Sequence, residues 1–88
     1  MDNVEQTLVD REKTHGSYKD VAACSQSLKY VISQGKSELT SAQAESLDMI
    51  CSKLARILCG DPNEPDHWHD IAGYAKLVER ELRRGEAE

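Results

Sequence analysis

The polar residues with the clearest capacity for chemistry lie in the segment 66–74. At about 100° per residue of a helix, Asp66 and Asp70 share one side with Gly73 and Tyr74, whereas apolar residues occupy another side. Two carboxylates one helical turn apart can bind a metal ion or a polar ligand where a neighbouring helix comes close. The alternative interpretation is a solvated acidic surface in which the glycine serves packing.

A second set of polar residues precedes this segment. Glu45 and Asp48 form another acidic pair, and oxygen ligands of this kind are what magnesium prefers. Carboxylates that converge need a divalent cation or basic side chains to neutralise them. Lys53 and Arg56 are the nearest candidates for contacts with phosphate. If the two helices turn their polar sides together, Glu45, Asp48, Asp66 and Asp70 can form a site for magnesium or manganese.

Length and charge restrict the class of protein. With 88 residues we expect one domain, 1–88, at a size where a single core is only marginally sufficient, so a homo-oligomer is expected. The net charge of −5 disfavours binding to nucleic-acid backbones, which needs clustered Lys and Arg. No apolar run approaches the roughly 20 residues of a membrane span, and we expect no membrane partner.

The cysteines indicate a reducing environment. The chain has an odd number of cysteines, with no Cys-x-x-Cys pair among Cys24, Cys51 and Cys59. The N-terminus lacks the apolar stretch of a signal peptide. We therefore expect a cytoplasmic protein with reduced thiols. Cys24 and Cys51 lie on the apolar sides of their expected helices, which favours small core residues over reactive thiols.

Apolar periodicity predicts four helices and no strand. The first is expected over 3–13 with Asp2 or Asn3 as its N-cap, and the second over 18–34 with Gly35 directly after its end. The third begins at Thr40 or Ser41, because Thr40 and Gln43 have the spacing of a capping box. It is expected to end at Gly60.

The fourth helix is expected from Pro65 or Asp66 to residue 83 or 84, and residues 84–88 are expected to form a frayed tail. The short loop before it makes the third and fourth helices an antiparallel hairpin, across which the first two helices would pack. The predicted fold is therefore all-α, a small helical bundle of about four helices built on that hairpin. Its expected core consists of Leu47, Ile50, Leu54, Leu58, Trp68, Ile71 and Val78.

The histidines support fewer interpretations. His67 and His69 resemble a metal-ligand pair, but on a helix their side chains point about 160° apart, so one zinc ion cannot readily bind both. His15 precedes Gly16 at an expected helix junction. It can serve there as a capping residue or contact a ligand.

Three segments resemble a family of small uncharacterised phage and prophage proteins: REKTHGSY at 11–18, LDMICSKLARILCGD at 47–61 and DHWHDIAGYA at 66–75. More remotely, the sequence is similar to MazG-like all-α nucleotide pyrophosphohydrolases, whose helices present acidic pairs to magnesium. In that group a Glu-Glu-x-x-Glu helix precedes a Glu-x-x-Asp helix. Here the acidic pairs are Glu45-x-x-Asp48 and Asp66-x-x-x-Asp70, and the first motif is missing.

The resemblance implies two alternative functions. The first is a phage-derived, MazG-like nucleotide-binding or nucleotide-pyrophosphohydrolase domain, with magnesium at the acidic residues and no assigned catalytic residue. Its nucleotide-binding residues would be Lys53, Arg56 and Tyr74. The second is a non-enzymatic phage anti-defence protein that binds a host defence protein or sequesters a nucleotide signal. Either would act in the cytoplasm of an infected or lysogenic bacterial host.

Overall fold

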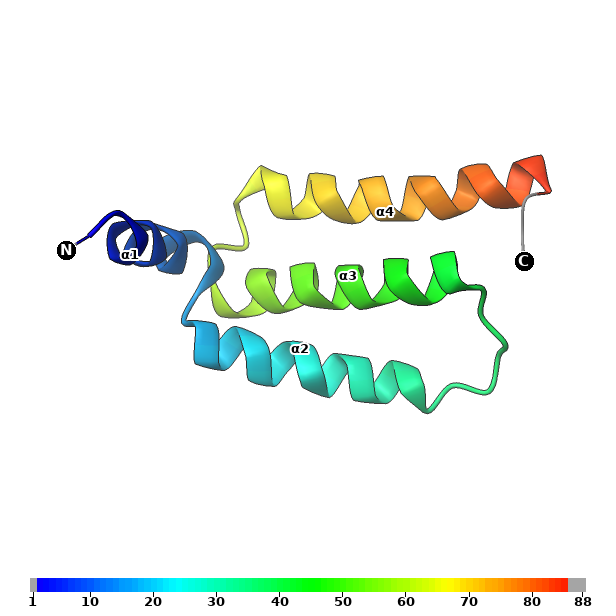
Figure 1. Ribbon diagram of the computed structural model, residues 1–88, viewed down its shortest axis with the longest axis horizontal. Helices are drawn as coiled ribbons and strands as arrows, with labels where there is room; N and C mark the ends of the chain where they lie inside the picture. The colour runs from blue at the N-terminus through cyan, green and yellow to red at the C-terminus, as the bar shows by residue number, and fades with distance from the viewer. Residues whose placement is uncertain (1, 86–88) are drawn as a thin grey trace.

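The computed structural model describes residues 2–85, which form four helices and no strand (Figure 1). The helices are α1 (Asn3–His15), α2 (Tyr18–Ser33), α3 (Ser41–Cys59) and α4 (Pro65–Arg84). The all-α prediction is confirmed, and each predicted helix end lies within two residues of the observed one. Of the predicted frayed tail, residues 86–88 lie outside the described residues.

Local capping groups set the helix starts. The backbone N–H of Glu5 donates to the carboxylate of Asp2 over 2.8 Å, which caps α1. At α3 the predicted capping box is present: the Gln43 N–H donates to the Thr40 hydroxyl, and the Thr40 N–H donates to the Gln43 side chain. Pro65 stands at the first turn of α4, where its missing N–H is not needed.

Gly35 and Gly60 follow the ends of α2 and α3, as predicted, but neither has the left-handed backbone that often ends a helix. Among residues 2–85 only Gly16 and Gly85 have a positive φ. Gly85 stops α4 with φ 72° and ψ 28°. Gly60 has φ −118°, so a close packing contact rather than a left-handed backbone accounts for the glycine there.

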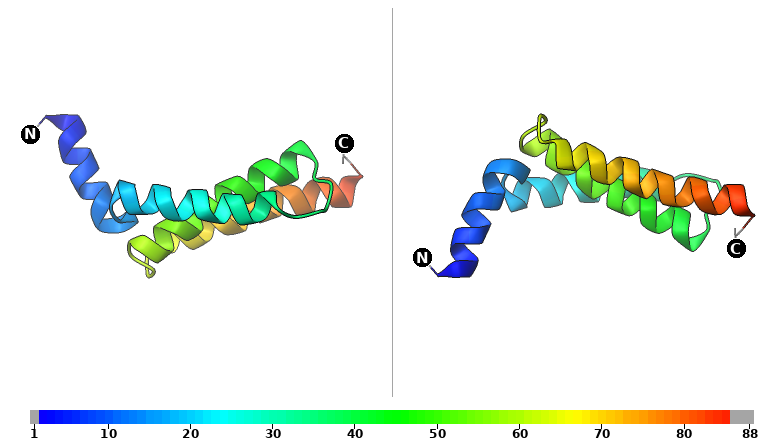
Figure 2. Two further views of the ribbon diagram at one scale, coloured as in Figure 1. Left: turned by 90° about the horizontal axis from the view of Figure 1, so that it is seen from below. Right: turned by 90° about the horizontal axis from the view of Figure 1, so that it is seen from above.

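Three helices form a single layer with α3 in the middle (Figure 1). α2 and α4 run antiparallel to α3 on its two sides, and in the described part of the chain they make no contact with each other. The predicted hairpin of α3 and α4 is thus present, but α2 packs along α3 instead of across the hairpin. α1 projects from one end of the layer (Figure 2), and none of its residues is buried.

The core of this layer is small. Cys51 and Ala55 of α3 are the fully buried hydrophobic residues within 2–85, and the predicted burial of Cys51 is confirmed. Leu58 and Trp68 were expected in the core, but they are 70% and 54% exposed. This expectation is wrong because a single layer covers each apolar stripe on one side only. The remaining predicted core residues are half-buried: Leu47, Ile50, Leu54, Ile71 and Val78.

All three thiols are free, as expected, and burial raises the pKa of the Cys51 thiol. Among residues 2–85 no helix combines the length and apolar character that crossing a bilayer requires.

Candidate anion-binding site

The α1–α2 junction meets the α3–α4 loop in direct backbone contact. The carbonyl oxygen of Thr14 accepts a hydrogen bond from the N–H of Asp61 over 2.8 Å and another from Nε2 of His67 over 3.2 Å. Because a carbonyl can only accept, Nε2 of His67 is the donor in this hydrogen bond. His67 is only 2% exposed. It therefore fastens the start of α4 to the end of α1.

Two glycines make this contact possible. A β-carbon added at Gly60 would lie less than 3.0 Å from the carbonyl oxygen of Thr14 and the carbonyl carbon of His15. One added at Gly16, whose φ is 88°, would meet the carbonyl oxygen of Cys59 at similarly short range. The two backbone segments, residues 14–16 and 59–61, are therefore in close contact at one end of the layer. We call these two segments together the junction.

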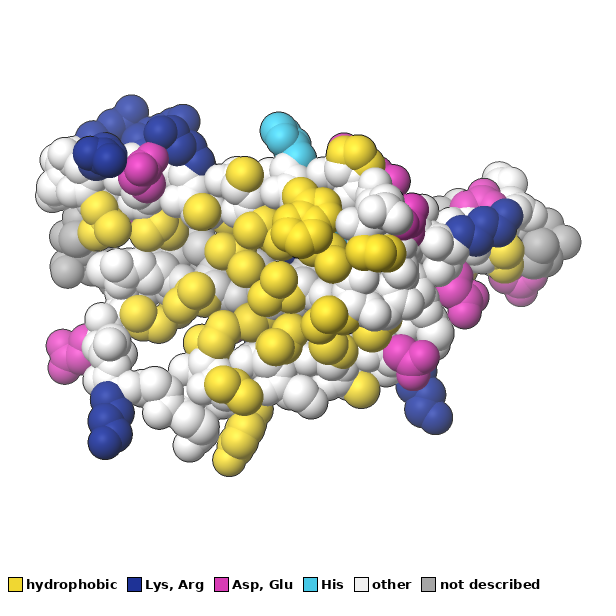
Figure 3. All heavy atoms as spheres, turned by 180° about the vertical axis from the view of Figure 1, so that it is seen from behind, with side chains coloured by type: hydrophobic (Ala, Val, Ile, Leu, Met, Phe, Trp, Pro, Cys, Tyr) yellow, Lys and Arg dark blue, Asp and Glu magenta, His cyan; other side chains and the backbone are white. Residues whose placement is uncertain are grey.

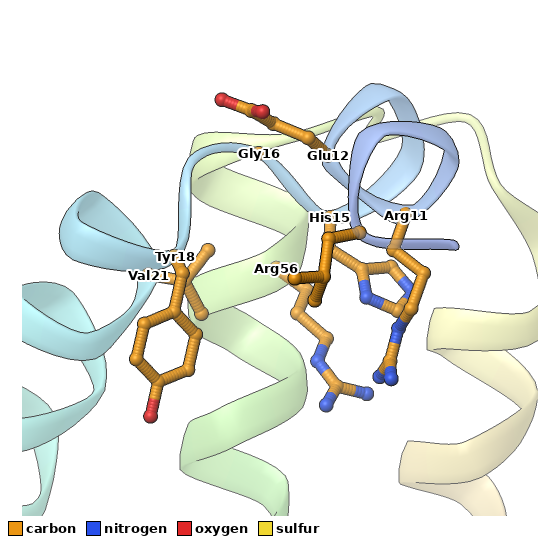
Figure 4. A pocket seen from close by; sticks show the side chains of 8 residues that line it. Arg11, Glu12, His15, Gly16, Tyr18, Val21 and Arg56 are labelled. Carbon is orange, nitrogen blue, oxygen red and sulfur yellow. The ribbon is translucent and has the colours of Figure 1, made fainter. Parts of the chain in front are cut away.

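Basic side chains gather beside the junction. The ring of His15 lies 5.1 Å from that of His67, between centroids. In Figure 4 the side chains of Arg11 and Arg56 extend in the same direction beside His15, whereas the carboxylate of Glu12 points away from them. Within residues 2–85 neither guanidinium group has a carboxylate within ion-pair distance. Two unpaired arginines next to a histidine offer hydrogen-bond donors and positive charge to an anion.

Lys53 differs from these arginines because it already has a partner. Its ammonium lies 2.8 Å from a carboxylate oxygen of Asp70, and its side chain is only 12% exposed. The hydrogen bond from Lys53 lowers the pKa of Asp70. The candidate phosphate contact predicted at Lys53 is thus occupied by Asp70, whereas the one predicted at Arg56 is open to a ligand.

Two pockets adjoin at His15 and Arg56, which line both of them. The first, of about 340 Å³, has an apolar and aromatic wall, to which Leu8, Tyr18 and Val21 contribute. The second is polar. It is lined by Thr14, His15, Lys53, Arg56, Glu64, Asp66, His67 and Asp70. A ligand at the shared wall would therefore meet cationic groups with an apolar surface on one side and polar groups on the other.

The electrostatic setting of His15 follows from this arrangement. Partial burial lowers its pKa, and the positive charge of Arg56 lowers it further. His67, Arg11 and Lys53 act in the same direction. The imidazole is therefore neutral at pH 7, and its protonation would add another positive charge to the cluster.

We expect acid to destabilise the free protein through His15. Its folded pKa lies below the unfolded value of about 6.5, so the unfolded chain binds more protons and the stabilising difference is lost as pH falls through the folded pKa. Arg11, Lys53, Arg56 and His67 oppose the added charge, and the carboxylates of Asp66, Asp70 and Glu64 line the same pocket.

Urea unfolding at pH 7.5 and 5.5 measures this loss, in a range above the titration of ordinary carboxyl groups. His15→Gln should lose less stability over that range than the parent. Equal losses in the two proteins would contradict the account of His15.

The structure brings together four of the residues predicted to form the site: Lys53, Arg56, Asp66 and Asp70 all line the polar pocket. The other three lie elsewhere. Glu45 lies fourteen residues before the end of α3. At a rise of 1.5 Å per residue, this is about 20 Å along the helix from the end that is joined to α4. Asp48 lines a hollow on the α2 side of α3, and Tyr74 lines a shallow one on α4 with Gly73 and Leu77.

The predicted magnesium quartet of Glu45, Asp48, Asp66 and Asp70 therefore does not converge. In the part of the chain that the structure describes, no three His, Cys, Asp or Glu side chains are grouped so that they could hold a metal ion. Gly73, predicted as a possible packing glycine, has open space around the position of an added β-carbon. The acidic side of α4 is tied to α3 by Lys53 and is otherwise open to solvent.

Sequence reasoning missed three parts of the site: the Arg11 side chain, the Thr14 carbonyl and the structural role of His67. The spacing of residues along α4 could have indicated the structural role of His67. His67 is spaced from Ile71, Tyr74 and Val78 as residues on one side of a helix are, and that side faces α3. The other two depend on the direction in which α1 leaves the layer.

These features define a small helical protein with two adjoining pockets at one end of the layer, which share His15 and Arg56. The chain belongs to a family described as a domain of unknown function, DUF6378, whose model matches residues 1–82. Searches of curated proteins and of solved structures found no significant match.

Proposed function

We propose that this chain binds a nucleotide, or a closely related phosphorylated small molecule, beside the junction of α1, α3 and α4. The observation that carries the proposal is the pair of guanidinium groups at Arg11 and Arg56, which have no carboxylate partner within residues 2–85. These two groups lie beside His15 in a chain with a net charge of −5. A bound phosphate would neutralise them.

The chemistry of the pocket suits a phosphate more than a simple halide. A guanidinium group donates two parallel hydrogen bonds to a phosphate, and two such groups side by side can hold a diphosphate. His15 would donate a further hydrogen bond. Burial and then the positive charge of Arg56 lower its pKa, and a bound anion would offset the second of these effects and favour the protonated ring.

The apolar wall beside the cationic side chains favours a nucleotide as the ligand over inorganic phosphate. Tyr18 is 85% exposed at the edge of the first pocket, and Leu8 and Val21 lie beside it. An exposed aromatic ring next to a phosphate site is a platform on which a base can stack. The remote similarity to MazG-like nucleotide pyrophosphohydrolases points to the same class of ligand.

The positions of the carboxylates favour nucleotide binding without hydrolysis. Magnesium-dependent pyrophosphohydrolysis needs several carboxylates around the metal, and Glu45 and Asp48 are too far from Asp66 to join it. We therefore propose that the protein sequesters a nucleotide, as a phage accessory protein directed at a nucleotide signal would.

Isothermal titration calorimetry with a panel of anions tests this function. Phosphate, pyrophosphate, nucleoside mono-, di- and triphosphates and cyclic dinucleotides would be titrated with and without magnesium, and each mixture scored for turnover. We expect at least one nucleotide to bind more tightly than pyrophosphate, without turnover. Magnesium-dependent turnover would instead support the hydrolase, and no binding by any anion would refute the proposed function.

A further inference from the structure

The layer of α2, α3 and α4 has one apolar side and one polar side. Helical spacing places Cys24, Leu28 and Val31 of α2 on the same side of the layer as Leu47, Leu54 and Leu58 of α3. On α4 the corresponding stripe is Trp68, Ala75 and Leu82, about a quarter turn from the side that faces α3. Figure 3 shows apolar side chains of the three helices gathered in one continuous area, which we call the apolar face.

Much of the apolar face is exposed to solvent. Val31 is 69% exposed, Leu58 70%, Trp68 54% and Leu82 52%. Apolar patches of this extent are rare on monomeric proteins, because each leucine or tryptophan left in water forfeits burial energy. α1 does not cover this area, since it leans toward the opposite side of the layer (Figure 2).

The single chain exposes more surface than a compact monomer of its mass. Such a monomer of 9.8 kDa exposes about 5,200 Å², whereas this chain exposes 6481 Å². The projecting α1 accounts for part of the excess of roughly 1,300 Å². A stable protein interface buries about 800 Å² from each partner, and pairing of two apolar faces would bury surface that the single chain leaves exposed.

We propose that the chain forms a symmetric homodimer in which the apolar faces of two copies pack together. In this dimer Leu58 and Trp68 would be buried, as the apolar periodicity of the sequence predicts. The candidate anion-binding site lies on the polar side of each layer and remains open. This inference is independent of the proposed function, because no ligand takes part in it.

Sedimentation equilibrium between about 1 and 100 µM tests the dimer. The parent should approach twice the 9.8 kDa chain mass. Leu82→Glu, on the apolar face, should raise the dissociation constant about 100-fold, because it would bury an unpaired charge. Leu77→Glu is a matched control: Leu77 is 53% exposed on the same helix but on the polar side, and its change should leave the dimer intact.

Leu58→Glu repeats the test on α3, with circular dichroism as the check that the helices persist. A parent that remains monomeric at 100 µM, or equal effects of Leu77→Glu and Leu82→Glu, would overturn the proposal.

Discussion

Gly60→Ala is expected to lower the free energy of unfolding by at least about 3 kcal/mol, or to prevent folding. The added β-carbon would collide with the carbonyl oxygen of Thr14 and the carbonyl carbon of His15, and it would lie 2.8 Å from the carbonyl oxygen of Arg56. All three atoms belong to the backbone, so no side-chain rotation relieves the contact. The junction would have to open, which would break the hydrogen bond from Asp61 to Thr14.

Gly73→Ala is the matched control for this change. The same methyl group is added in the middle of α4, where nothing lies within 4 Å of it. Alanine has the higher helix propensity, so stability should rise by about 0.5–1 kcal/mol. Urea unfolding monitored by circular dichroism measures both variants, and a Gly60→Ala protein as stable as the parent would show that the junction is not interlocked.

Arg56→Gln should weaken nucleotide binding by about 10- to 100-fold, with little loss of stability. A hydrogen bond to a charged group contributes about 1.5–3 kcal/mol, and Arg56 is the arginine shared by both pockets. Its removal leaves no carboxylate without a partner among residues 2–85, so the fold should persist. Arg56→Lys should give an intermediate affinity, because an ammonium keeps the charge but loses the paired hydrogen bonds.

Arg80→Gln removes the same group at the opposite end of α4, far from the junction, and serves as the control in the same calorimetric titration. Its affinity for nucleotide should equal that of the parent. If both variants bind equally well, the anion does not contact Arg56. If both lose affinity equally, the attraction comes from overall charge and not from the site.

The predictions from sequence succeeded where the determining interactions are local. Thr40 and Gln43 bond to each other's backbone across three residues, so the start of α3 could be predicted without any knowledge of the rest. Burial of Leu58 and Trp68 could not be predicted in this way. Periodicity shows which side of a helix is apolar, but not whether a neighbour covers it.

The same distinction between local and long-range interactions applies to the candidate site. Arg56, Asp66 and Asp70 lie in one pocket because a short loop holds their two helices side by side. Glu45 was assigned to the same site on chemical type alone, although an antiparallel hairpin places it at the far end. The contact between Thr14 and His67 joins residues 53 apart in sequence, and no local pattern indicates it.

The most direct test of the anion site is to map backbone amide shifts by NMR during titration with the tightest-binding nucleotide. The largest changes should fall at residues 14–16 and 59–61 and around Arg56, with a separate change at Tyr18 from the base. The α2–α3 loop, residues 34–40, lies at the other end of the layer and should not shift. Shifts centred on that loop, or on Tyr74 and Leu77 of α4, would place the ligand elsewhere and contradict the site.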